Sequence, residues 1–233
     1  KLEKKLAQNL IMRTKFYGSK MDLMQNNLFG KKLIKSITFN EQELIRDILY
    51  LHCNGNAIDL DATYSIGKFY EKGIISPKYK FDISPKLDDV KKACSTNLPL
   101  NNNSINVMMF DPPFVFEKRN RINTYTDKVS SGRFSIYTKG FKELEKHYKG
   151  TLKEAYRILK NKGILIFKCQ DYTDSKTTLT HCYVNQWANE IGFYSKDLFI
   201  LLSKAAIANK NLNQRHARKY HSYFFVFVKN KTK

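Results

Sequence analysis

The sequence predicts a single α/β domain, a doubly wound and mostly parallel Rossmann-like sheet that ends in an antiparallel hairpin. Short apolar runs alternate with segments of helical spacing along most of the chain. Two further apolar runs, 198–202 and 223–228, lie near the carboxyl end with a basic stretch between them. At 233 residues, with 42% apolar residues, the chain is long enough for one domain with a full core.

The amino-terminal region differs in character from the rest of the chain. Residues 1–39 are basic and only irregularly apolar, so we expect a helical or extended arm there. Asn40 begins a predicted helix that runs to about Leu51, with Glu43 completing a capping-box-like pattern. The folded domain is therefore expected over residues 40–233.

The remaining elements follow from hydrophobic periodicity. Strands are predicted where apolar runs are short and continuous, and helices where apolar residues recur three or four positions apart. The segment 115–140 has no clear periodicity and is predicted to be a long loop. The predicted strands are 57–60, 79–83, 105–110, 164–169, 198–202 and 223–228, and the helices after the first are 87–94, 141–159 and 179–191.

Composition limits the classes of function. The chain has 41 Lys and Arg against 21 Asp and Glu, and its net charge of +20 attracts polyanions. No stretch approaches the roughly 18 apolar residues of a membrane span, and residues 1–5 lack a secretory core, so we expect an intracellular protein, cytoplasmic or nucleoid-associated, with no membrane partner. The four cysteines form no C-x-x-C pair, and no metal site is expected.

The most specific motif is Asp111-Pro112-Pro113-Phe114, which directly follows the predicted strand 105–110. Ligands of open α/β sheets bind at the carboxyl ends of strands. Two consecutive prolines fix φ and remove two N–H donors, which gives a rigid turn with available carbonyls. A carboxylate, a fixed carbonyl and an aromatic ring are therefore expected at one place, although an ordinary turn would also use these residue types.

This motif resembles the D-P-P-F/Y motif of S-adenosylmethionine-dependent amino-methyltransferases, of the N6-adenine DNA methyltransferase type. The resemblance implies a class I methyltransferase fold, S-adenosyl-L-methionine as cofactor, and Asp111, Pro112, Pro113 and Phe114 as catalytic residues. The target amine would donate hydrogen bonds to the Asp111 carboxylate and the Pro112 carbonyl, which would aim its lone pair at the methyl group. Phe114 would stack on the base.

Upstream segments resemble the cofactor-binding segments of the same family. The run from Asp61 to Phe69 is similar to the D-P-F-x-G-x-G loop, with Ala62 and Ser65 replacing proline and glycine. Asp82 closes the next predicted strand and suits the ribose hydroxyls. The run from Cys94 to Pro99 resembles the segment that flanks the cofactor adenine. The cofactor-binding residues that the resemblance implies are Asp61, Thr63, Ser65, Gly67, Asp82, Ile83, Cys94 and Leu98.

Two basic segments are candidates for contact with nucleic acid. The loop 115–140 mixes Lys and Arg with aromatic residues, which suits phosphate contact and base stacking. The run from Lys204 to Lys219 contains five basic residues and no acidic one. The predicted contact residues are Lys118, Arg119, Arg121, Arg133, Lys204, Arg215, Arg218 and Lys219.

Together with the resemblance, these features predict an adenine-specific methyltransferase that acts on DNA. In the family, Asp or Asn in the first motif position is typical of N6-adenine enzymes and Ser of N4-cytosine enzymes. No cysteine follows a proline, which disfavours the covalent C5-cytosine mechanism. Two alternatives stay open: an RNA methyltransferase for adenine or guanine amines, and a non-catalytic nucleic-acid-binding subunit, which the departures at Ala62, Ser65 and Cys94 would allow.

Overall fold

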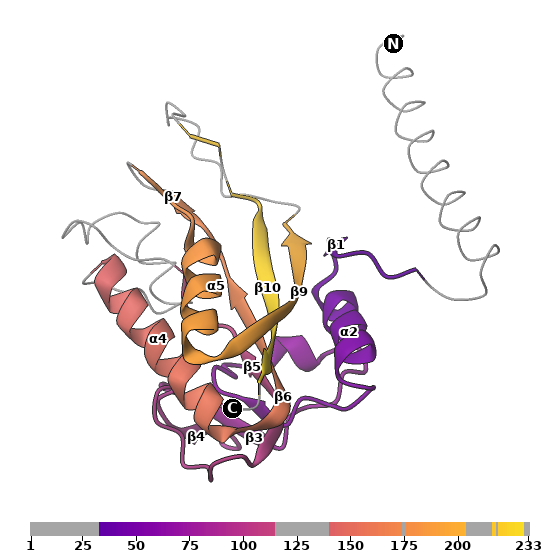
Figure 1. Cartoon of the computed structure of the whole chain (residues 1–233). Coiled ribbons are helices and arrows are strands. Elements are labelled where there is room, and N and C mark those ends of the chain that lie inside the picture. The colour runs from indigo at the N-terminus through magenta and orange to yellow at the C-terminus, as the bar shows by residue number, and fades with distance from the viewer. Residues whose placement is uncertain (1–32, 115–139, 174–175, 204–215, 218, 231–233) are drawn as a thin grey trace. The chain divides into compact units, whose positions relative to one another are not determined.

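The computed structural model describes residues 33–114, 140–173, 176–203, 216–217 and 219–230 (Figure 1). Residues from Ser36 onward form a compact unit of their own, separate from residues 1–35. In chain order, the elements of this unit are β1 (Ile37–Thr38), α2 (Glu41–His52), β2 (Leu60–Asp61), the 3₁₀ helix η1 (Lys68–Tyr70), β3 (Tyr79–Asp82), β4 (Lys91–Lys92), β5 (Ile105–Phe110), α4 (Phe141–Ile158), β6 (Leu159–Cys169), β7 (Tyr172–Thr173), β8 (Thr177–Thr178), α5 (Thr180–Ile191), β9 (Phe193–Leu202) and β10 (His221–Lys229).

The main sheet is mixed and mostly parallel. Its strand order is β1-β9-β10-β6-β5-β2-β3-β4. β10 runs antiparallel to both of its neighbours, β6 and β9, and the other strand pairs are parallel. This is a class I methyltransferase-like α/β fold, as the sequence predicted. The strand order reverses between β2 and β5, and ligands of such sheets bind at that switch point.

Helices cover both faces of the sheet. Accordingly, the side chains of a central strand are apolar on both faces, as β10 shows. Phe225 and Phe227 of β10 belong to the apolar cluster that contains residues of α4 and α5. Phe224 and Val226, which alternate with them along the strand, are also buried but point to the opposite face. α2 contacts η1 and β9, and it buries Leu44, Ile45 and Ile48. Figure 1 shows α4 and α5 together on one side of the sheet.

Several predicted elements are confirmed. Asn40 caps α2 and accepts a hydrogen bond from the N–H of Glu43 at 3.2 Å. The strand before the proline motif has the predicted bounds, and Gly192 ends α5 in a left-handed conformation with a φ of 115°. The terminal hairpin is formed by β9 and β10, which are antiparallel along their length. Among the described residues, no helix is both long and apolar enough to cross a membrane.

One predicted helix, 87–94, is wrong. Val90 is the one buried side chain of this segment and Leu87 is exposed, so the segment buries no continuous apolar face against the core. Lys91 and Lys92 instead form β4 and extend the sheet beside β3.

Other boundaries shift by a few residues. The strand predicted at 57–60 is Leu60–Asp61, and β6 begins directly after α4, at Leu159, five residues earlier than predicted. Ile37 and Thr38 pair with β9, within the region predicted as an arm. The domain boundary at residue 39 stays a prediction.

Candidate active site

Charged side chains meet where the parallel strands end, along what we call the carboxyl edge of the sheet. Asp82 ends β3, Asp61 ends β2, and Asp111 follows β5 directly. Lys168 is the last residue but one of β6. Because the strands lie in the order β3, β2, β5, β6, these four residues follow one another across the switch point.

The Asp111 carboxylate is held by Lys168 through one oxygen only. Lys168 Nζ lies 3.2 Å from Oδ2 of Asp111. The other oxygen, Oδ1, is buried and has no hydrogen-bond partner in the part of the chain that the structure describes. Burial raises the pKa of Asp111, the ammonium of Lys168 opposes this rise, and the nearby Glu41 adds to it. Among the described residues, Oδ1 is thus a buried acceptor without a donor.

Lys168 is the centre of this charged group. Its Nζ also donates to Glu41 Oε1 at 2.9 Å. Glu41 is in the first turn of α2, where the helix dipole favours a negative charge. Burial alone would lower the pKa of Lys168, but the charges of Asp111 and Glu41 outweigh burial and raise it. The lysine therefore stays protonated between two carboxylates.

Aromatic rings enclose the same ammonium. Nζ of Lys168 lies 4.9 Å from the centroid of Phe69, 5.3 Å from that of Phe224 and 5.8 Å from that of Phe114. Phe224 is the direct partner of Lys168 in the β6–β10 ladder, so both side chains point to the face that α2 covers. Cation–π attraction adds to the ion pairs in holding the lysine.

Thr63 joins the ends of β2 and β5. Its hydroxyl oxygen accepts the N–H of Asp111 at 2.8 Å, and its own N–H donates to Asp61 Oδ1 at 2.8 Å. Tyr70 donates its hydroxyl to Asp61 Oδ2 at 2.7 Å. Asp61 is completely buried, and burial raises its pKa to about 7 despite these hydrogen bonds, with the charge of Asp111 contributing. The buried carboxyl of Asp61 therefore fixes the loop that supports Asp111.

The two prolines have different surroundings. Tyr148 of α4 donates its hydroxyl to the Pro113 carbonyl at 2.8 Å, which anchors the turn to the helix. The buried Pro112 has no hydrogen bond to its carbonyl from the described residues. Phe114 is half-buried, with its ring toward Lys168. The Pro113 carbonyl is thus engaged by α4, and the Pro112 carbonyl accepts no hydrogen bond from the described residues.

On the other side of the switch point, Asp82 organises the loop after β2. Its Oδ2 accepts the N–H of Ser65 at 2.9 Å, and its Oδ1 accepts the N–H of Ser84 at 2.8 Å. Ser65 has a positive φ of 50°. Ile83, the next residue after Asp82, is 60% exposed. This loop and Asp82 therefore form one hydrogen-bonded unit with an apolar side chain at its surface.

Gly67 in the same loop is required by the packing of Tyr64. Its φ is 71°, and a Cβ at this position would lie 2.5 Å from the Tyr64 hydroxyl oxygen. Tyr64 is held by a hydrogen bond to Ser76 at 2.9 Å and by stacking on Tyr70. The close approach that demands glycine is thus to an internal tyrosine.

The segment 94–98 is fixed to α4. The N–H of Leu98 donates to Glu154 Oε1 at 2.7 Å, and the Ser95 hydroxyl bonds His147 and Thr151. Burial would raise the pKa of Glu154, but its hydrogen bonds, first that from Arg157, lower it. Leu98 is buried in the core, and the Sγ of Cys94 lies 3.0 Å from Thr96 Oγ1.

Sequence reasoning located the carboxylates but missed Lys168, Glu41 and Tyr148. The available signal for Lys168 was a single charge in the apolar run Ile164 to Cys169. For Glu41 and Tyr148 no local signal existed, because each lies on a helix far along the chain from the residue it contacts.

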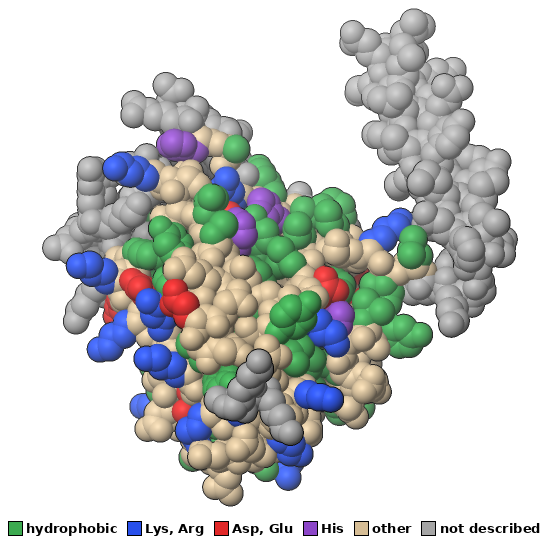
Figure 2. Space-filling model, viewed as in Figure 1, with side chains coloured by type: hydrophobic (Ala, Val, Ile, Leu, Met, Phe, Trp, Pro, Cys, Tyr) green, Lys and Arg blue, Asp and Glu red, His purple; other side chains and the backbone are tan. Residues whose placement is uncertain are grey.

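Most of the predicted nucleic-acid contacts lie outside the described residues: Lys118, Arg119, Arg121, Arg133, Lys204, Arg215 and Arg218. Lys219 is described, and its carbonyl accepts a hydrogen bond of 3.5 Å from Gln170 Nε2. On the face in Figure 2, Lys and Arg side chains are scattered rather than gathered in one patch. Within the described ranges, no group of three or more His, Cys, Asp or Glu could hold a metal ion.

Comparisons with known proteins give distant structural neighbours only. No protein-family model matches the sequence, and no curated protein matches it. A "putative DNA modification methylase" from Thermus thermophilus, complexed with S-adenosyl-L-methionine, aligns at 13% identity and a TM-score of 0.39, over 58% of this chain and 52% of its own. The PvuII DNA methyltransferase (cytosine-N4-specific) aligns at 14% identity and a TM-score of 0.42, over 58% and 47%.

A third neighbour covers more of the chain. A "putative sarcosine dimethylglycine methyltransferase" from Galdieria sulphuraria aligns at 12% identity and a TM-score of 0.49, over 90% of this chain and 98% of its own. The chain spans only about half the length of the two DNA methylase structures. At these identities the likeness concerns the fold alone.

Proposed function

We propose that this chain is an S-adenosyl-L-methionine-dependent methyltransferase that methylates the exocyclic N6 amine of adenine in DNA. The observation that carries the proposal is the Asp111 carboxylate, whose buried Oδ1 lacks a donor among the described residues while Oδ2 is held by Lys168. An exocyclic amine supplies N–H groups, the complement of this oxygen and of the Pro112 carbonyl.

The chemistry expected of these residues is orientation. The lone pair of a base amine is delocalised into the ring, so the amine is a weak nucleophile. Two hydrogen bonds, one to Asp111 Oδ1 and one to the Pro112 carbonyl, favour a pyramidal nitrogen and direct its lone pair outward. Phe114 offers a ring on which an unstacked base can lie. Fixed acceptors need no rearrangement as positive charge develops on the nitrogen.

The residues around the switch point fit the cofactor. S-adenosyl-L-methionine would supply an electrophilic methyl group on a sulfonium cation. Each oxygen of Asp82 accepts one backbone N–H, which leaves further lone pairs for the two ribose hydroxyls. The exposed Ile83 offers an apolar surface to an adenine ring. Asp111 and Glu41 together exceed the single charge of Lys168, so the group favours a cation nearby.

The other cofactor residues that we propose are Thr63, Ser65 and Gly67 on the loop after β2, and Cys94 and Leu98 on the segment that α4 holds. Asp61 is expected to act through this loop, because its own oxygens bond Thr63 and Tyr70. The DNA substrate is proposed from the net charge of +20 and from the motif, in which Asp111 favours adenine.

The test is transfer of tritium from labelled S-adenosyl-L-methionine to genomic DNA and, separately, to total RNA, followed by nucleoside analysis. We expect label in N6-methyladenine from DNA, and at least a hundredfold less with D111A, since both orientation and charge complementarity are lost. Label found only in RNA nucleosides, or in N4-methylcytosine, would contradict the substrate assignment.

A control separates loss of chemistry from loss of structure. D88A removes an exposed carboxylate and should transfer label like the wild type. Calorimetric titration with S-adenosyl-L-methionine should show that D111A still binds the cofactor, within about tenfold of the wild type, because one of several contacts is lost. If the wild type binds no cofactor with or without nucleic acid, the chain is instead a non-catalytic subunit.

A further inference from the structure

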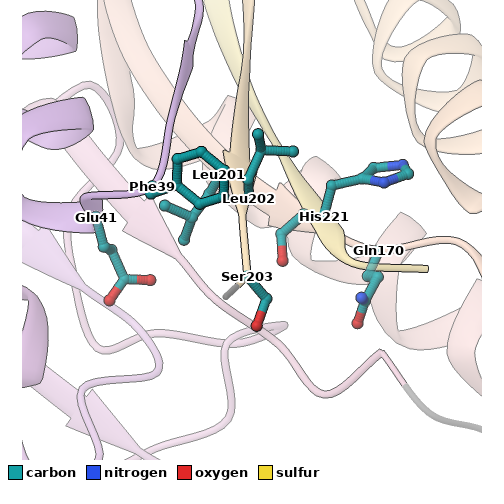
Figure 3. Close-up of a pocket in the computed structure, with 8 residues that line it drawn as sticks. Phe39, Glu41, Gln170, Leu201, Leu202, Ser203 and His221 are labelled. Atoms are coloured by element: carbon teal, nitrogen blue, oxygen red, sulfur yellow. The ribbon is translucent and has the colours of Figure 1, made fainter. Parts of the chain in front are cut away.

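A pocket of about 280 Å³ opens at the carboxyl edge beside the Asp111 group. It is formed where β9 ends, β10 begins and α2 starts, next to the end of β6. Figure 3 shows the carboxylate of Glu41 and the amide of Gln170 on opposite sides of Ser203, with Phe39 and Leu201 on the Glu41 side. The imidazole of His221 points away from the space between these side chains.

The pocket is connected to the candidate active site through Glu41. This residue lines the pocket, and its Oε1 accepts from Lys168, which also holds Asp111. Two hydrogen bonds, of 2.9 Å and 3.2 Å, therefore link a wall of the pocket to the carboxylate proposed to receive the target amine. A molecule in the pocket would be an immediate neighbour of the target base.

The pocket is distinct from the places proposed for the target base and the cofactor. None of its lining residues belongs to the motif Asp111–Phe114. The proposed cofactor residues lie near β2, β3 and β4, on the other side of β5, whereas the pocket lies at the end of the sheet formed by β10, β9 and β1. The pocket can therefore hold a chemical group other than the target base and the cofactor.

The side chains of the pocket suit a planar heterocycle with polar edges. Phe39 is 56% exposed, so its ring is available for stacking. Glu41 can accept from an amino group, and the amide of Gln170 can both donate and accept, which matches the edges of nucleobases. Gln170 also bonds the backbone of Lys219, a residue of the basic segment. Volume, aromatic face and mixed polarity together favour a nucleobase over an aliphatic ligand.

We infer that this pocket binds the base of the nucleotide next to the target adenine, unstacked from its neighbours and resting on Phe39. The inference rests on the proposed function, since it takes its substrate to be a nucleic acid. It assigns sequence preference at one flanking position to Phe39, Glu41 and Gln170.

The test measures binding, so it does not depend on methyl transfer. Fluorescein-labelled oligonucleotides with one adenine carry an abasic site at each flanking position in turn, and their affinity is measured by anisotropy. With the wild type, we expect one flanking abasic site to weaken binding about tenfold, the loss of one base–aromatic stack. With F39A the intact oligonucleotide should bind about tenfold more weakly, and the same abasic site should have no further effect.

Two further variants test whether the effect depends on an aromatic ring at position 39. F39W should restore the penalty of the abasic site, because tryptophan also stacks. Y50A removes another exposed aromatic ring, one that does not line the pocket, and should behave like the wild type. Equal penalties in the wild type and F39A at every flanking position would overturn the inference, even if label transfer to adenine succeeds. Conversely, a penalty that needs Phe39 would stand even if no methyl transfer is detected.

Discussion

Lys168 and Asp111 form an ion pair of 3.2 Å that binds Oδ2 of the carboxylate, while Oδ1 receives no hydrogen bond from the described residues. The pair has two effects. It fixes the orientation of the carboxylate, and it keeps an ionised acceptor in a place where burial favours the neutral acid. A protonated Asp111 would lose acceptor capacity, so the charge of Lys168 is expected to set the lower pH limit of activity.

Replacing Lys168 with methionine tests this directly. K168M keeps much of the side-chain volume but removes the ammonium that opposes the rise in the pKa of Asp111. Since the carboxylate must be ionised to act, the acid limb of the pH–rate profile should move to higher pH, and transfer at pH 7 should fall about tenfold or more. K160M, which changes an exposed lysine of the same strand, is the control. An unchanged acid limb in K168M would show that the ion pair has no such role.

Replacing Glu41 with glutamine should shift the profile in the opposite direction. The charge of Glu41 raises the pKa of Asp111, so its removal in E41Q should lower that pKa and move the acid limb to lower pH. The glutamine can still accept a hydrogen bond from Lys168. The pH dependence of kcat under saturating cofactor, compared with that of K168M, checks the sign. Shifts of the same direction in both variants would contradict the electrostatic account.

The residues at the carboxyl edge differ in how far sequence could predict them. Asp111 and Asp82 were predictable because each stands at the end of a predicted strand, and ligands of this fold bind at the carboxyl ends of the parallel strands. Lys168 could be assigned to the site only from the structure. The pairing of β5 with β6 places it beside Asp111, and the alternation of side chains along β6 directs it to the face that α2 covers. Glu41 was not predicted as a site residue, because its partner Lys168 lies 127 residues away along the chain. Such pairings depend on tertiary contacts that no local pattern encodes.

The wrong helix at 87–94 has a related cause. Leu87, Val90 and Ala93 are spaced like a helix face, yet Leu87 is 41% exposed in the structure. The open edge of β3 offered the segment backbone hydrogen bonds that outweighed a weak helical pattern.

Gly67 and Gly55 allow backbone strain to be separated from steric exclusion. Both have a positive φ, of 71° and 73°, but only at Gly67 would a Cβ meet another side chain, that of Tyr64. Each alanine should cost about 1 kcal/mol or more in strain, and G67A should cost at least about 1 kcal/mol beyond G55A. Urea denaturation measures both values. In a Y64A background the excess for G67A should disappear; if it persists, the contact with Tyr64 is not the reason for glycine.

Tyr148 is expected to act through the Pro113 carbonyl. Y148F removes the hydroxyl that donates to this carbonyl at 2.8 Å but keeps the ring, which packs against Phe110 and Phe167. The variant should lose about 1 kcal/mol of stability. Because the turn is less firmly held, kcat should fall several-fold with little change in cofactor affinity. Y156F is the control. It removes the hydroxyl of a tyrosine in the last turn of α4, which donates to the carbonyl of Asn230. Equal kcat for both variants would contradict a positioning role.

Asp61 should make the folding stability depend on pH in an unusual direction. Its pKa rises from 3.8 to about 7 on folding because the carboxyl is completely buried. Between these values the folded state keeps a proton that the unfolded state has released. The free energy of unfolding contributed by Asp61 therefore falls as the pH rises from about 4 to 7, by up to on the order of 4 kcal/mol. Below about pH 4 Asp61 is protonated in both the folded and the unfolded state, so its contribution no longer changes with pH.

The variant D61N removes this titration and can still accept the N–H of Thr63. Relative to the wild type, D61N should gain stability steadily from pH 4 to 7 and level off above pH 7. Urea denaturation at pH 4.5, 6 and 8 gives the difference at each pH, and D88N, at an exposed carboxylate, should track the wild type throughout. A constant difference between D61N and the wild type across this range would mean that Asp61 remains ionised in the folded protein. In that case its bonds to Tyr70 and Thr63 outweigh its burial.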